Sequence, residues 1–365
     1  MIIITCFILL AISVWYVPAR IKALLKLPLV WPWRLAALGI AAGYPFLLIS
    51  SAYISENAVV AVIYNVSGLL FIFHVCLFLY LIIAHLFSRL LKNISGRAVL
   101  TTGLALSLAY VIFGFIQALS FTVTTFNLPV KGLSAAVKIA HIPDLHLGSQ
   151  RGESYLRQVI SAVNEHQPDI VIFNGDLVDS NIALHPGLFS LFKSLNGEKY
   201  FTTGNHEFYI DTPRALELIA GSGLRILRNE MTETHGFQLI GLEYMNADRV
   251  TYDSHAVNDL TIEEELPKIN RDRARPTVLI HHSPVGLQYV SKGGIDLMLS
   301  GHTHGGQLFP GTVLAKLSYP LLKGLYDIDG TMFLVSQGAG TFGPWMRAGT
   351  FNEIQIITLK PPANE

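Results

Sequence analysis

The sequence predicts a helical membrane anchor of about four spanning segments, followed by an α/β domain with two mixed β-sheets packed face to face and helices outside. The first observation is composition: 51% of the 365 residues are hydrophobic and 14% are charged, which is too apolar for an ordinary soluble protein. The second is that long apolar runs crowd into the first third of the chain. The third is a later series of strand-like runs that each end in a polar motif. We therefore place the anchor at 1–122, a linker at 123–136 and a globular domain at 137–365.

Four apolar segments qualify or nearly qualify as membrane-spanning helices, which need ~20 apolar residues. They are residues 2–17, 35–54, 58–87 and 98–121. The first segment is short, as in a cleavable signal peptide. However, no basic stretch precedes it, and Pro18 and Arg20 stand where a small-residue cleavage site would lie. We therefore expect a retained, multi-pass anchor.

Basic residues predict the orientation of this anchor. They follow the first and third segments, at Arg20, Lys22, Lys26, Arg34, Arg89, Lys92 and Arg97. The loop between the second and third segments has only Glu56 as a charged residue. Because basic loops stay in the cytoplasm, four spans place the globular domain on the extracytoplasmic side. An odd number of spans would reverse this orientation.

Charge and cysteine content exclude some classes of function. The formal net charge is zero and no extended basic block is present, so we expect no nucleic-acid partner. Both cysteines, Cys6 and Cys76, lie in apolar segments of the anchor. Any metal ion in the globular domain must therefore be held by His, Asp, Glu or Asn side chains.

The globular part alternates strand-like runs with helical spacing. VKIAHI runs into PDLH, DIVIFN into GDLVD, KYFTT into GNHE, TVLIH into HSP, and DLMLS into GHTH. Residues 153–166 carry apolar side chains at helical spacing, which predicts a βαβ unit of about 30 residues. Residues 237–244, 332–337 and 352–359 predict further strands. Because binding groups gather beyond the carboxyl ends of strands in α/β sheets, we expect the motifs to meet at one site.

The motifs supply many potential metal ligands, namely Asp144, His146, Asp176, Asn205, His206, His281, His282, His302 and His304. In an extended chain residues i and i+2 point the same way, so Asp144 can act with His146 and His302 with His304. This mixture suits Mn, Fe or Zn. The number of ligands is too large for one ion. It suits two ions about 3.5–4 Å apart that share a carboxylate, an arrangement used for displacement at phosphorus.

Glycines precede three of these ligands, at Gly175, Gly204 and Gly301, where the chain must turn abruptly or approach the cluster closely. The outlying histidines are expected to have structural or surface roles; they are His141, His166, His185, His235 and His255.

The series PDLH, GDLVD, GNHE, HHSP and GHTHGGQ resembles the calcineurin-like metallophosphoesterases, over about residues 137–359. The resemblance implies a four-layer α/β/β/α sandwich. It also implies that the first metal ion is held by Asp144, His146 and His304, and the second by Asn205, His282 and His302. Asp176 would bridge the two ions, and His206 would lie beside the scissile phosphate as an acid or charge stabiliser.

Two positions leave alternatives open. His281 competes with His282 as a ligand, although the family pattern His-x-Pro favours His282, which Ser283 and Pro284 follow. The later glycine-rich segment 338–356 is similar to that of a membrane-associated bacterial branch of the family. Its Arg347 is expected either to bind a phosphate oxygen of the substrate or to be a solvated surface residue.

These features predict a membrane-anchored phosphatase or phosphodiesterase in which a hydroxide bridging two divalent ions attacks phosphorus while His206 assists the leaving group. Residues 308–326 are apolar, and form either a covered loop or a wall that admits a lipid tail. The expected substrate is accordingly a phosphoester, with a lipid or envelope precursor as one candidate. The alternatives are a UDP-diacylglucosamine-type pyrophosphatase, a non-catalytic metal-binding scaffold and a membrane signalling module.

Overall fold

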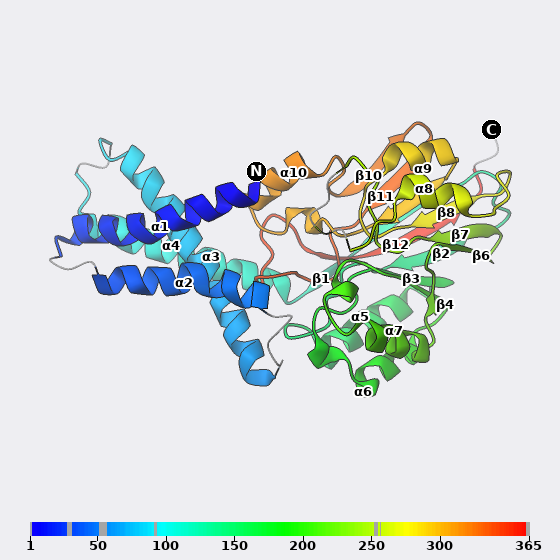
Figure 1. Cartoon of the computed structure of the whole chain (residues 1–365), viewed down its shortest axis with the longest axis horizontal. Coiled ribbons are helices and arrows are strands. Elements are labelled where there is room, and N and C mark those ends of the chain that lie inside the picture. Colours follow the sequence, from blue (N-terminus) through cyan, green and yellow to red (C-terminus); the bar gives the residue numbers. More distant parts are fainter. Residues whose placement is uncertain are drawn as a thin grey trace. The chain divides into compact units, whose positions relative to one another are not determined.

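The computed structural model describes residues 2–27, 31–50, 57–90, 93–251, 255 and 257–362. The chain divides into two compact units. One contains Met1–Gln117 with Gly343–Met346, and the other contains Ala118–Phe342 with Arg347–Glu365. The N-terminal helices and the sheet-containing domain are coloured from blue to red along the chain in Figure 1.

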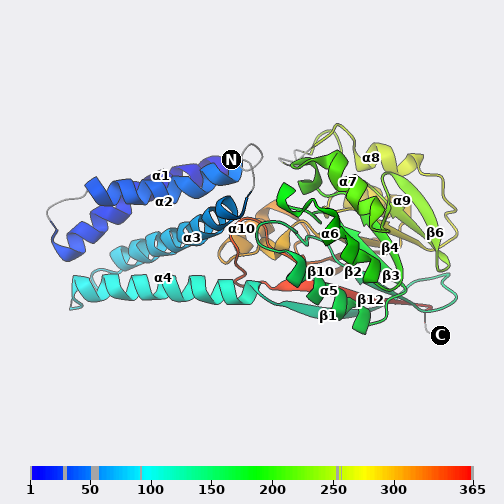
Figure 2. The same ribbon diagram turned by 90° about the horizontal axis from the view of Figure 1, so that it is seen from below.

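The first unit consists mainly of long helices, seen side-on in Figure 2. They are α1 (Ile2–Leu25), α2 (Trp31–Ser50), α3 (Ala58–Leu86) and α4 (Gly96–Ala118). Within the described residues, Ile8–Leu25, α3 and α4 are long and apolar enough to cross a membrane. Three candidate spans are thus found where about four were predicted. Helix α2 falls in the predicted second span without being one of the three, and residues 51–54 of that span lie outside the described residues.

Contacts inside this unit join α1 to α3. Val17 packs with Leu77 and Leu81 in a buried apolar cluster. The Oγ atom of Ser13 lies 2.9 Å from Nε2 of His74, which gives that buried histidine a polar partner inside the bundle. Such a contact fits a structural role for a histidine on an apolar helix.

The second unit contains two six-stranded sheets. The first has the order β1-β12-β2-β3-β4-β5, and the second has the order β10-β11-β9-β8-β7-β6. The strands of the first sheet are β1 (Phe121–Pro129), β2 (Val137–His141), β3 (Ile170–Asn174), β4 (Glu198–Thr202), β5 (Arg225–Ile226) and β12 (Asn352–Lys360). Those of the second are β6 (Glu230–Thr234), β7 (Phe237–Gly241), β8 (Thr277–Ile280), β9 (Leu297–Ser300), β10 (Gly324–Ile328) and β11 (Thr331–Val335).

Both sheets are mixed, as predicted. In the first, β2, β3, β4 and β5 run parallel while β12 is antiparallel to β2. In the second, β7, β8, β9 and β11 run parallel, and the antiparallel strands β6 and β10 form its edges. The parallel strands therefore direct their carboxyl ends to one edge of each sheet.

Helices cover the outer faces of the sheets. They are α5 (Glu153–Glu165), α6 (Pro186–Phe189), α7 (Thr212–Gly221), α8 (Ile262–Glu265) and α9 (Leu287–Gly293). A further helix, α10 (Gly311–Ser318), has no buried residue. Short 3₁₀ turns are η1 (Asn181–Ala183), η2 (Ser190–Ser194), η3 (His206–Phe208), η4 (Leu266–Lys268) and η5 (His304–Gly306).

Side-chain alternation along the strands builds the layers. Val171 and Phe173 of β3 point outward and pack with α5, whereas Ile172 points inward and shares a core cluster with Leu239 of β7. A third cluster joins α8 and α9 to the outer face of the second sheet. Helix, sheet, sheet and helix thus form the four predicted layers.

The segment predicted as a linker, 123–136, is partly a strand. Strand β1 pairs in parallel with β12 over its whole length of nine residues. Leu128, Val130 and Leu133 then enter the core between the sheets. The prediction followed the change in composition and overlooked the β-branched and aromatic pattern FTVTTF, which is typical of strands. The placement of a domain boundary between 122 and 137 otherwise stays a prediction.

Candidate metal centre

The predicted motifs all follow the carboxyl ends of neighbouring strands. Asp144 and His146 follow β2, Asp176 follows β3, Asn205 and His206 follow β4, His281 and His282 follow β8, and His302 and His304 follow β9. These strands belong to both sheets, so the loops of the two sheets meet over one site. The side chains named here are buried, apart from a partly exposed His302.

One group of candidate ligands contains Asp144, His146 and His304, with one ligand atom from each within 4.8 Å of the others. The Nε2 atoms of His146 and His304 are 3.1 Å apart, and Nε2 of His304 lies 3.4 Å from Oδ1 of Asp144. Two imidazole nitrogens and a carboxylate converging at such distances can hold one transition-metal ion. This is the set that the family resemblance implied for the first ion.

A second group contains Asp176, His282 and His302. Nε2 of His282 lies 3.0 Å from Oδ2 of Asp176, and the same Asp176 oxygen is 3.9 Å from Nε2 of His146 in the first group. Asp176 therefore lies between the two groups. His281 points elsewhere, since its Nδ1 contacts the carbonyl oxygen of Ser283. The geometry accordingly favours His282 over His281 as the candidate ligand.

Asn205 carries a buried oxygen that lacks a partner. Within the described residues its Oδ1 accepts no hydrogen bond, while its Nδ2 donates to the hydroxyl of Tyr209 at 3.4 Å. An unpaired buried carbonyl oxygen costs about 1–3 kcal/mol unless another group binds it. The next residue, His206, donates its backbone N–H to Oδ1 of Asp176 at 2.9 Å. Oδ1 of Asn205 is therefore suited to bind a metal ion beside Asp176.

Burial and the neighbouring carboxylates set the protonation of three candidate histidine ligands. Burial lowers the pKa of His302 and of His304 well below the usual value, which keeps both rings neutral. Burial lowers the pKa of His282 too, but Asp176 and Asp144 outweigh it and raise that pKa to about 10. Nδ1 of His282 must donate to the carbonyl oxygen of Asn174, 2.7 Å away, so Nε2 is the atom directed at the carboxylates.

Backbone conformation brings these groups together. Asp144, His146, Asp176, His302 and His304 all have positive φ angles, between 49° and 67°. They are not extended, as the argument from i and i+2 spacing assumed. His302 and His304 consequently fall into different groups. Strained backbone of this kind is concentrated at functional sites.

The glycines of the motifs permit the close packing, as expected. A Cβ atom on Gly204 would collide with Oδ1 of Asp176, and one on Gly301 would collide with Oδ2 of Asp144. Any side chain at these positions would thus displace a candidate ligand.

The comparisons with known proteins agree with this site. The sequence model of the calcineurin-like phosphoesterase family matches residues 137–306. An uncharacterized metallophosphoesterase of Aquifex aeolicus is 32% identical over 259 residues, which cover 68% of this chain and 94% of that protein. The chain belongs to the calcineurin-like metallophosphoesterase family. The resemblance and the fold class predicted from the motifs are thereby confirmed.

Two longer metallophosphoesterases are also similar. A transmembrane protein with metallophosphoesterase domain from Danio rerio is 34% identical over 258 residues, covering 65% of this chain and 57% of that protein. An uncharacterized metallophosphoesterase of Campylobacter jejuni is 32% identical over 243 residues, covering 65% of this chain and 63% of that protein. The chain therefore spans about three fifths of the length of these two relatives.

The metallophosphoesterase site contains an acidic residue that the sequence reasoning missed. Oδ1 of Asp179 lies 2.6 Å from Nδ1 of His206 and 3.3 Å from Nδ1 of His146. Burial lowers the pKa of His206, but Asp176 and Asp179 outweigh it and raise that pKa to about 9. Asp179 thus holds a protonated His206 in place. The sequence feature that could have revealed Asp179 is its place as the second aspartate of GDLVD, three positions after Asp176.

Glu207, the last residue of GNHE, is a second omission. Its buried carboxylate accepts hydrogen bonds from the backbone N–H groups of Asp176, Leu177, Val178 and Gly204, at 2.7–3.2 Å. The GDLVD and GNHE loops are tied together through this one side chain. Charge-assisted bonds to backbone N–H groups are strong, so Glu207 fixes where the candidate ligands of both loops lie.

Arg347 does not fit the predicted phosphate-binding role. Its side chain is fully buried, and its guanidinium donates to Asn352, Thr350 and the carbonyl oxygens of His304, Gln337 and Gly340. With its donors committed inside the protein, none is left for a substrate. Nor is it a solvated surface residue, the other expectation. Arg347 instead holds the loop that carries His304, whose carbonyl oxygen is 2.7 Å from Nη1.

His255 is closer to the site than expected. It was assigned to the outlying histidines, yet its ring centroid is 5.3 Å from that of His302 and its Nδ1 is 3.5 Å from the hydroxyl of Tyr209. The contact joins residues 46 or more positions apart in the sequence, so motif spacing could not reveal it.

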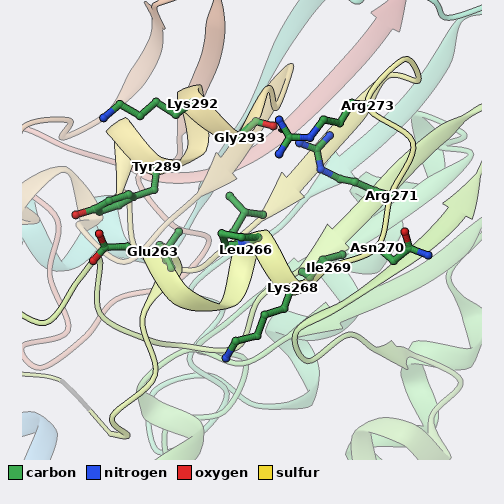
Figure 3. Close-up of a pocket in the computed structure, with 12 residues that line it drawn as sticks. Glu263, Leu266, Lys268, Ile269, Asn270, Arg271, Arg273, Tyr289, Lys292 and Gly293 are labelled. Atoms are coloured by element: carbon green, nitrogen blue, oxygen red, sulfur yellow. Dashed lines mark hydrogen bonds between the residues drawn. The ribbon is translucent and has the colours of Figure 1, made fainter.

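A separate pocket lies between η4 and α9, and Figure 3 labels the basic side chains Lys268, Arg271, Arg273 and Lys292 around it. None of the motif residues lines this pocket. Arg271 donates to the carbonyl oxygen of Gly293. Lys268 pairs with Glu265 at 2.6 Å. This pocket is therefore not the candidate metal centre.

Proposed function

We propose that this metallophosphoesterase hydrolyses phosphoesters with two bound divalent ions, of which Mn, Fe and Zn suit the ligands best. The observation that carries the proposal is the buried, unpaired Oδ1 of Asn205 beside two groups of convergent ligands. Asp144, His146 and His304 would hold one ion; Asn205, His282 and His302 would hold the other, and Asp176 would bind both. When bound, such a pair supplies Lewis acidity and lowers the pKa of a coordinated water.

The protein's own groups would assist the departure of the leaving group. His206 is protonated at neutral pH, with Asp179 on its Nδ1, and its Nε2 lies 3.9 Å from Oδ2 of Asp176. Nε2 is therefore the atom that can donate a proton to the leaving oxygen beside the candidate metal centre. The carboxylate of Asp179 on Nδ1 fixes the orientation of the ring, so that the N–H of Nε2 stays directed at the site.

An amphiphilic substrate, such as a lipid-linked or envelope phosphoester, is the substrate class we propose. The support is the segment that directly follows GHTHGGQ, where large apolar side chains lie exposed, namely Phe309, Val313, Leu314 and Leu317. The same segment carries Lys316 and Lys323 and no acidic residue up to Tyr326. A basic, apolar surface beside the site suits an anionic lipid, and the chain's own apolar helices would keep it near a bilayer.

With α2 as a fourth span, the basic loops favour an extracytoplasmic catalytic domain. A UDP-diacylglucosamine-type substrate would require the cytoplasmic side. Labelling of a Val250→Cys variant, with Cys6 and Cys76 replaced by serine, distinguishes the two, because Val250 is 93% exposed. An impermeant maleimide should label it in intact cells. Labelling only after lysis would put the domain in the cytoplasm.

Hydrolysis itself is tested with detergent-solubilised protein that is stripped with chelator and reloaded with Mn, Zn, Fe or Mg. Chromogenic phosphomonoesters and phosphodiesters serve as substrates. Asn205→Ala should abolish hydrolysis, whereas the matched control Asn270→Ala, an exposed asparagine, should leave it unchanged. Near-normal turnover by Asn205→Ala would refute the ligand assignment. Bound metal without any hydrolysis would favour the non-catalytic scaffold.

A further inference from the structure

An exposed aromatic ring stands beside His206. The centroid of the Phe342 ring is 4.9 Å from that of His206, in an edge-to-face arrangement, and 6.2 Å from that of His146. Phe342 nevertheless keeps 37% of its surface exposed. One part of the ring thus contacts the candidate catalytic histidine while another part faces solvent.

Gln307 holds the backbone of Phe342 from two sides. Its Nε2 donates to the carbonyl oxygen of Phe342 at 2.7 Å, and the Phe342 N–H donates to its Oε1 at 3.0 Å. Gln307 is the last residue of GHTHGGQ, and its own N–H donates to the carbonyl oxygen of His304 at 3.0 Å. The ring is accordingly fixed to the loop that carries candidate metal ligands.

A scattered exposed apolar residue on a protein surface needs no special explanation. Phe342 differs because both hydrogen-bonding groups of its backbone are held by a single side chain, and because its ring lies against the proposed proton donor. The aromatic ring of Tyr209, 44% exposed, contacts His206 as well, with centroids 5.2 Å apart. His206 is thus framed by two partly exposed aromatic rings.

We propose that Phe342, positioned by Gln307, is the wall of an apolar subsite for the leaving group. The subsite would select phosphoesters whose leaving group presents aryl or acyl-chain surface next to the ester oxygen. This inference rests on the proposed function. If Nε2 of His206 protonates the leaving oxygen, the carbon attached to that oxygen must lie close to His206, where the exposed part of the Phe342 ring can contact it.

The test is equilibrium binding to the full chain in detergent, loaded with Mn, measured by calorimetry. The probes are phenylphosphonate and methylphosphonate, which share one anionic group, carry unhydrolysable P–C bonds and differ in apolar surface. Aromatic contacts contribute enough to binding that Phe342→Ala should weaken the affinity for phenylphosphonate about fivefold to tenfold. The affinity for methylphosphonate should change by less than about twofold. Phe342→Leu should retain most of the preference for phenylphosphonate over methylphosphonate.

Two further variants complete the test. Gln307→Leu, which removes both bonds to the Phe342 backbone, should reproduce the selective loss while metal content stays that of wild type. Val250→Ala removes an exposed apolar side chain outside the motif loops, and should have no effect. If Phe342→Ala lost affinity equally for both phosphonates, or lost none, the subsite would be overturned and the proposed function left intact. Failure of both phosphonates to bind wild type would overturn the two together.

Discussion

Replacement of Arg347 by methionine distinguishes a structural arginine from a substrate-binding one. Methionine fills a similar volume but cannot donate, so the buried carbonyl oxygens of Gln337, Gly340 and His304 and the Oδ1 of Asn352 would lose this donor. Each unsatisfied buried acceptor costs about 1–3 kcal/mol. Burial lowers the pKa of Arg347 to about 9, so losing the buried charge offsets part of that cost.

We expect a net loss of about 3 kcal/mol, which corresponds to a fall in Tm of roughly 6–12 °C for a domain of this size. The assay is thermal unfolding of the solubilised chain followed by near-UV circular dichroism. Arg157→Met is the matched control, because Arg157 makes only an exposed i,i+4 pair with Glu153, and it should shift Tm by less than about 2 °C. An unchanged Tm for Arg347→Met together with a raised KM would refute this reasoning and restore the phosphate-binding role.

Three other changes test separate parts of the account. Asp179→Asn should lower kcat roughly 10- to 100-fold with little change in KM or metal content, since it removes an orienting partner of His206, the proposed proton donor; unchanged kcat in steady-state assays would exclude that role. Glu207→Gln places amide hydrogens against backbone N–H donors, so its Tm should fall by several degrees while that of the exposed control Glu217→Gln stays constant. Leu317→Asp should slow hydrolysis of a phosphoester embedded in vesicles about tenfold but not that of a soluble one. The exposed control Val250→Asp should affect neither, and equal slowing of both substrates by Leu317→Asp would remove the membrane role of α10.

The parts of the structure that sequence reasoning found are those encoded locally. Strand runs and motifs are contiguous, and the carboxyl ends of parallel strands bring the motifs together, so Asp144, Asp176 and His282 could be expected in one site. The glycines before the candidate ligands also helped to predict the site, because each glycine permits a close approach of the backbone at its own position in the sequence.

The parts that it missed depend on distant contacts. Strand β1 gains its partner β12 from the other end of the domain. Arginine is usually exposed, and only the folded arrangement of carbonyl groups shows why Arg347 is buried. The pairing of Gln307 with Phe342 spans 35 positions. Asp179 could have been noticed within GDLVD, but its partner His206 lies in another loop, so the motif alone did not show its role.

Metal analysis of the purified chain tests the central claim most directly. Wild-type protein extracted from membranes and measured by inductively coupled plasma mass spectrometry should contain about two transition-metal ions per chain. Asn205→Ala should retain about one ion and lose phosphoester hydrolysis, because it removes a ligand from one of the two groups. Equal metal content and equal turnover in the two proteins would contradict the account.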